Sequence, residues 1–115
     1  MIPAAAPQPL CRLEDIPDGE GRGFVFGSEC EQEFVFVLRR GRRVFGYRNS
    51  CPHIGTPLDM IPDRFLTRDR RHILCSTHGA RFRIEDGYCI AGPCKGEQLK
   101  ALPLAVIDGT IVLRA

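Results

Sequence analysis

The chain has 115 residues, of which 43% are hydrophobic and 26% charged, values typical of one soluble globular domain. Its formal net charge is only +2 and no long basic or acidic block occurs, so nucleic-acid binding has no electrostatic support. No segment approaches the ~20 apolar residues that a membrane-spanning helix needs.

The first nine residues carry three prolines and lack both a basic start and an apolar stretch of export-signal length. We predict a flexible arm over residues 1–9 and expect a cytoplasmic location. Thiols stay reduced in that compartment, so metal binding explains the six cysteines better than three disulfides do.

Strand patterns dominate both ends of the chain. Runs of aromatic and β-branched residues predict strands at residues 24–26, 34–38, 44–47, 102–107 and 110–113. A turn at 39–42 and the Asp108-Gly109 pair each predict a hairpin. The predicted fold class is therefore all-β, with an antiparallel scaffold formed by residues 10–48 and 96–114.

The region between these ends, residues 49–95, is rich in proline and glycine and holds four of the six cysteines. Short strands are predicted at residues 72–75, 80–84 and 88–90, with a turn at 85–87 and a single helical turn near Leu58 to Ile61. We interpret this region as a loop-rich subdomain inserted into the scaffold, within one domain that covers residues 1–115.

Two short elements in that subdomain carry candidate metal ligands. Cys51 and His53 form a C-x-H element, and after 21 intervening residues Cys75 and His78 form a C-x-x-H element. Each element supplies one soft thiolate and one imidazole. This donor set suits either a tetrahedral zinc ion or an iron–sulfur cluster, and the four ligands alone leave both open.

The residues around the four ligands resemble the Rieske iron–sulfur family, whose signature is C-x-H-x-G-x-x-L followed by C-x-x-H-G. The matching positions are Cys51, His53, Gly55, Leu58, Cys75, His78 and Gly79. Phe82, the turn at 86–87 and Gly92-Pro93, which is similar to the family's proline loop, extend the likeness over roughly residues 10 to 113.

The resemblance implies one [2Fe–2S] cluster per chain, with Cys51 and Cys75 bound to one iron and His53 and His78 bound to the other. The two histidines are expected to lie near the surface. Two neutral imidazoles in place of two thiolates raise the reduction potential to roughly −150 to +300 mV, against about −400 mV for four-cysteine ferredoxins.

Departures from the family pattern predict the subtype. High-potential members have a disulfide between the ligand loops and hydroxyl groups that bond the cluster sulfurs. Here Thr56 and Thr77 stand at the disulfide positions, and Ala80 and Phe82 at the hydroxyl positions. We therefore expect a soluble, low-potential ferredoxin-like protein near the lower end of the Rieske range.

By resemblance, the function is that of a monomeric one-electron carrier and not an enzyme, passing electrons from a reductase to an oxygenase or similar redox enzyme, with no membrane partner. The chain has no G-x-G-x-x-G unit for a nucleotide. The alternative is a small subunit similar to that of nitrite reductase, or a redox-sensing regulatory module of a larger complex.

The remaining histidine and cysteines have simpler interpretations. His72 lies outside both ligand elements and is expected to be a surface residue, and Cys11 and Cys30 are expected to pack as small hydrophobes. The resemblance places Cys94 near the cluster. It is interpreted as a packing residue, with a redox-sensitive thiol or a partner for Cys89 under oxidation as the alternatives.

Overall fold

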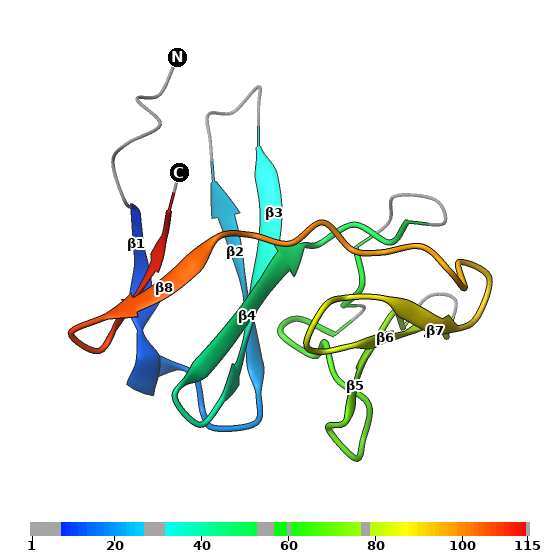
Figure 1. Ribbon diagram of the computed structural model, residues 1–115, viewed down its shortest axis with the longest axis horizontal. Helices are drawn as coiled ribbons and strands as arrows, with labels where there is room; N and C mark the ends of the chain where they lie inside the picture. Colours follow the sequence, from blue (N-terminus) through cyan, green and yellow to red (C-terminus); the bar gives the residue numbers. More distant parts are fainter. Residues whose placement is uncertain (1–7, 27–31, 53–56, 60, 77–78, 115) are drawn as a thin grey trace.

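The computed structural model describes residues 8–26, 32–52, 57–59, 61–76 and 79–114, which form an all-β molecule with one short 3-10 helix. Its three antiparallel sheets have the strand orders β1-β9-β8, β2-β3-β4 and β5-β6-β7 (Figure 1). The elements are β1 (Gln8–Arg12), η1 (Leu13–Asp15), β2 (Gly21–Phe26), β3 (Glu33–Arg40), β4 (Arg43–Arg48), β5 (His72–Leu74), β6 (Arg81–Arg83), β7 (Cys89–Ala91), β8 (Leu104–Ile107) and β9 (Thr110–Leu113). The predicted all-β class is confirmed.

The central strand β3 contributes to two cores at once. Phe36 and Leu38 belong to a large apolar cluster that includes residues of β5, β6 and β7, whereas Val37 belongs to a smaller cluster that includes Ile111 of β9. This division follows from the alternation of side chains along a strand. Because both faces are covered, residues 35–38 form a continuous apolar run in the sequence.

The first and last strands pair with each other. Gln8 of β1 lies opposite Leu113 of β9, so β1 begins two residues before the expected scaffold boundary at residue 10. Pro9 is tolerated there because β1 is an edge strand. Of the expected arm over residues 1–9, residues 1–7 lie outside the described part of the chain.

Both predicted hairpins are present. Gly41 turns the chain between β3 and β4 with a φ of +64°, in the left-handed region that glycine adopts without steric cost. Asp108 and Gly109 join β8 to β9 with φ values of +50° and +76°. Positive φ at both central residues is what a type I′ turn requires.

The third sheet, β5-β6-β7, lies beside the β2-β3-β4 sheet (Figure 1) and falls within the predicted subdomain, residues 49–95. Tyr47 at the end of β4 is 2% exposed and donates its hydroxyl hydrogen to the Ile84 carbonyl at 2.5 Å. This bond joins the scaffold to the turn after β6. The helical turn expected near Leu58 to Ile61 includes Met60, which lies outside the described residues.

The described residues form no helix of the length and apolar character that crossing a membrane requires.

Candidate metal centre

The first ligand element begins shortly after β4, where Asn49 holds the two ends of its loop together. The Asn49 side-chain oxygen accepts the Leu58 N–H at 2.7 Å, and its amide nitrogen donates to Asp59 Oδ1 at 2.8 Å. Cys51 lies inside this loop and is fully buried. His53 lies outside the described residues.

The second ligand element is a tight loop between β5 and β6. The Gly79 N–H donates to the Cys75 carbonyl at 2.8 Å, and the Cys75 N–H donates to the Ala80 carbonyl at 2.9 Å. Gly79 has a φ of +72°, a conformation that favours glycine. Cys75 is fully buried, and His78 lies outside the described residues.

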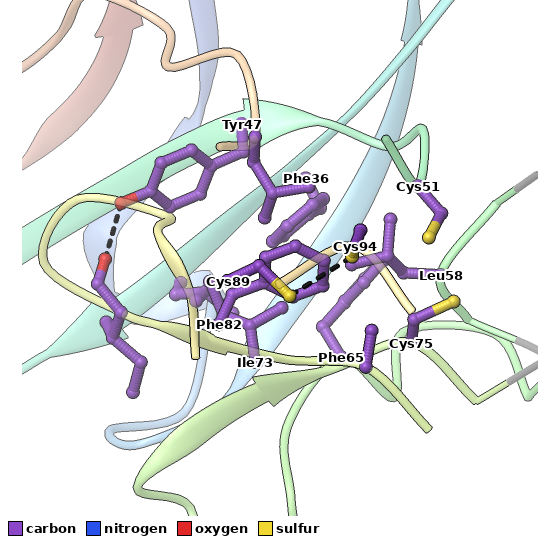
Figure 2. Close-up of a cluster of buried hydrophobic side chains, with 14 residues drawn as sticks. Phe36, Tyr47, Cys51, Leu58, Phe65, Ile73, Cys75, Phe82, Cys89 and Cys94 are labelled. Atoms are coloured by element: carbon purple, nitrogen blue, oxygen red, sulfur yellow. Dashed lines mark hydrogen bonds between the residues drawn. The ribbon is translucent and has the colours of Figure 1, made fainter. Parts of the chain in front are cut away.

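The two loops are joined to each other. The Ser76 N–H donates to the Leu58 carbonyl at 3.0 Å, and Cys51 and Cys75 belong to the same apolar cluster. Figure 2 shows both cysteines at the same edge of that cluster. The fold therefore brings together two of the four predicted ligands. Among the described residues no three His, Cys, Asp or Glu side chains form a metal-binding group, because only two of the predicted ligands are described.

A third loop packs against the second ligand loop. It connects β7 to the returning chain and is closed by two hydrogen bonds, from the Cys89 N–H to the Glu97 carbonyl at 2.8 Å and from the Gly96 N–H to the Cys89 carbonyl at 3.1 Å. Gly92 in this loop lies against Ala80, so its Cβ would be 2.7 Å from the Ala80 Cα. Gly92, the first residue of the Gly92-Pro93 pair, therefore lies beside the second ligand loop.

The surroundings of Cys51 and Cys75 suit a thiolate-bound iron–sulfur group. Their cluster is made of apolar and cysteine side chains apart from Tyr47, and Thr67 is the only polar or charged residue buried elsewhere in the described chain. Burial is the main cause that raises the pKa of the neighbouring Cys94 thiol, followed by its hydrogen bond with Cys89. Thiolates in such a dry site are stabilised when they bind metal.

Cys11 and the third histidine lie elsewhere. Cys11 is half-buried against the smaller cluster, in keeping with a packing role, and Cys30 lies outside the described residues. His72 begins β5 and is half-buried rather than fully exposed.

The sequence interpretation did not identify Asn49 as part of the site. An asparagine directly after a strand was the available signal, because its side chain commonly bonds nearby backbone groups in loops.

Comparisons with known proteins place the chain in a family. The family model "Rieske [2Fe-2S] domain" matches residues 6–106. A comparison with curated protein sequences gives no match.

Solved structures share the fold at low sequence identity. The ferredoxin of carbazole 1,9a-dioxygenase from Nocardioides aromaticivorans IC177 is 24% identical, with a TM-score of 0.74 over 96% of this chain and 98% of that chain. A ferredoxin from Sphingomonas yanoikuyae B1 is also 24% identical, with a TM-score of 0.71 over 96% and 99%. The terminal oxygenase of carbazole 1,9a-dioxygenase from Novosphingobium sp. KA1 is 20% identical, with a TM-score of 0.77 over 95% of this chain but 29% of that chain.

The match over residues 6–106, together with two buried cysteines held at one edge of an apolar cluster, shows that the chain belongs to the Rieske [2Fe-2S] domain family.

Proposed function

We propose that this protein is a one-electron carrier whose [2Fe–2S] cluster is bound by Cys51, His53, Cys75 and His78. The observation that carries the proposal is the convergence of Cys51 and Cys75, from two hydrogen-bonded loops, at one edge of a buried apolar cluster. When bound, the cluster accepts and releases single electrons. The described residues fit it because they supply two thiolates in a site shielded from water.

The chain's own residues act on the cluster by restraint and by exclusion of water. The Asn49 side chain and the Ser76 N–H hold the two ligand loops in fixed positions. A rigid ligand set limits the structural change that accompanies each electron transfer. Ala80 and Phe82 belong to the same buried cluster and offer no hydroxyl hydrogen to the sulfurs, which supports a low reduction potential.

We further propose that the protein takes electrons from a reductase and delivers them to an oxygenase or a similar redox enzyme. This chain matches nearly the full length of two ferredoxins, one of them named as a component of a dioxygenase, but less than a third of an oxygenase chain. The likeness to a ferredoxin named as a component of a dioxygenase supports a carrier role. Among the solved structures that it matches is a complex of oxygenase and ferredoxin in carbazole 1,9a-dioxygenase.

Ligand substitution tests the proposed cluster site. Oxygen-protected protein should contain iron and acid-labile sulfide, and Cys51→Ala, Cys75→Ala and His78→Ala should each lose most of both. Cys11→Ala and His72→Ala are matched controls outside the site and should keep them. Equal metal and sulfide content in the His78→Ala variant and the parent would contradict the assigned ligands.

Electron transfer is tested separately with the loaded protein. A flavin-dependent ferredoxin reductase should reduce the cluster in a rapid-mixing experiment, and the reduced protein should then reoxidise in the presence of a Rieske oxygenase. Stable co-purification with a large enzyme and failure to react as a free protein would favour the subunit interpretation over the carrier.

A further inference from the structure

Two cysteines that are not among the predicted ligands face each other inside the large apolar cluster. The sulfur atoms of Cys89 and Cys94 are 3.1 Å apart, and the two residues are 0% and 2% exposed. Figure 2 shows this contact as a dashed line, with the Cys94 sulfur lying between Cys89 and Cys51. A disulfide has its sulfurs about 2.05 Å apart, so the pair needs to close by about 1 Å to bond.

The backbone holds this pair together. Both cysteines lie in the loop that the Cys89–Glu97 and Gly96–Cys89 hydrogen bonds close, and the Glu97 N–H also donates to the Cys94 carbonyl at 2.9 Å. The folded backbone already holds the two sulfurs close together, so a bond between them costs little further conformational entropy. A reaction between groups positioned in this way is strongly favoured over one between separate molecules.

Simple packing explains the pair less well. The Cys89 thiol donates to the Ala91 carbonyl at 3.2 Å and faces the Cys94 sulfur on its other side. Both side chains lie among the apolar groups of the large cluster, but such packing does not by itself require their sulfurs to meet. Here the two sulfurs face each other at 3.1 Å, so a small movement brings them to bonding distance.

We propose that Cys89 and Cys94 form a redox-active pair that interconverts between a dithiol and a disulfide beside the cluster-binding loops. The oxidant is a low-molecular-weight disulfide. One cysteine sulfur attacks it, which gives a mixed disulfide and releases one small thiol. The second cysteine sulfur then attacks the mixed disulfide and releases the other small thiol. The two cysteine thiols lose two electrons and two protons, and the small disulfide receives them and becomes two small thiols.

Access to the buried pair requires local opening of the exposed part of the loop, since Gly92, Pro93, Lys95 and Gly96 all lie at the surface. Only the small population in which the loop is open can react, so exchange at this pair is slower than at a surface thiol. The reaction must therefore be followed to equilibrium, approached from both the reduced and the oxidised side.

The test uses the loaded protein in a series of reduced and oxidised glutathione mixtures under exclusion of oxygen. Samples are quenched with acid, denatured and alkylated, and the modified cysteines are located by peptide mass mapping. The proposal expects two of the six cysteines to lose alkylation together, a cross-link between Cys89 and Cys94, and no loss of the visible absorbance of the cluster. Cys89→Ser and Cys94→Ser should abolish the transition, and Cys11→Ser should retain it.

Complete alkylation of Cys89 and Cys94 across the whole series would overturn the proposal. So would a cross-link that involves Cys51 or Cys75 and appears only as the visible absorbance disappears. Peptide mass mapping of the protein without substitutions distinguishes these results, so the test remains valid even if a serine variant fails to fold. A colourless protein that still forms the Cys89–Cys94 cross-link would contradict the proposed function and support this inference, so the two can fail separately.

Discussion

Gly92 lies close against Ala80, although the two residues belong to different loops. A Cβ atom on Gly92 would come within 2.7 Å of the Ala80 Cα, and Gly92 has a φ of +98°. Ala80 comes two residues after His78, the last residue of the second ligand element, so this contact holds the third loop against the proposed second ligand loop.

Substitution of Gly92 should therefore weaken cluster binding. Gly92→Ala combines a backbone clash with a positive φ and should cost more than about 2 kcal/mol. Gly41→Ala is the matched control, because Gly41 has a φ of +64° but no atom within 4 Å of its Cβ position, and it should cost only about 1 kcal/mol. The measurement is the rate of iron release to a chelator during mild urea treatment. Equal rates for the two variants would contradict the role of the contact.

Asn49 offers a second test of how the ligand loops are held. Asn49→Ala removes the partner of the Leu58 N–H and should destabilise the first loop by about 1–3 kcal/mol, so iron should be released faster. Asp59→Asn is the control, since it keeps an oxygen that can accept from Asn49 and loses only the bond from the Asp63 N–H to the other carboxylate oxygen. If both variants behave like the parent, the Asn49 hydrogen bonds do not support the site.

The hydroxyl of Tyr47 provides a pH-dependent prediction. Burial raises the pKa of Tyr47 to about 12, from an ordinary value of 10.0. The unfolded state therefore loses this proton first, so stability present below about pH 10 should decrease as the pH rises toward 12. Ultraviolet titration of the Tyr88→Phe variant reports Tyr47 alone, because the chain has two tyrosines. A midpoint near pH 10 would show that Tyr47 is not held in the buried state.

The reduction potential tests the effect of Ala80 and Phe82. We expect a midpoint near the lower end of the Rieske range, roughly −150 mV. Ala80→Ser introduces a hydroxyl donor and should raise it, by about 59 mV if the reduction equilibrium changes tenfold. Redox titration followed by visible absorbance measures both proteins. A midpoint well above zero in the parent would contradict the low-potential assignment.

Local sequence signals predicted most of the strands and both hairpins. The run at residues 34–38 and the pair Asp108-Gly109 carry their conformational preferences in nearby residues, and the structure confirms them. The pairing of β1 with β9 was not predicted, because it joins residues about 100 positions apart and the residues of β1 have no alternating pattern.

The candidate site was also predictable only where local sequence patterns determine it. Spacing and residue type indicated Cys51 and Cys75, and the structure brings them to one cluster. The contact of Gly92 with Ala80 and the approach of Cys89 to Cys94 depend on how the loops pack, and no local pattern encodes that packing. His53 and His78 lie outside the described residues, so their assignment as ligands still rests on the motif.

The most direct test of the account is paramagnetic resonance of the dithionite-reduced, oxygen-protected protein, with detection of nitrogen coupling. A [2Fe–2S] centre bound by two cysteines and two histidines should give one unpaired electron per cluster, with coupling to two nitrogen atoms. A protein with no signal, or a signal without nitrogen coupling, would contradict the mixed ligand set on which the proposed function depends.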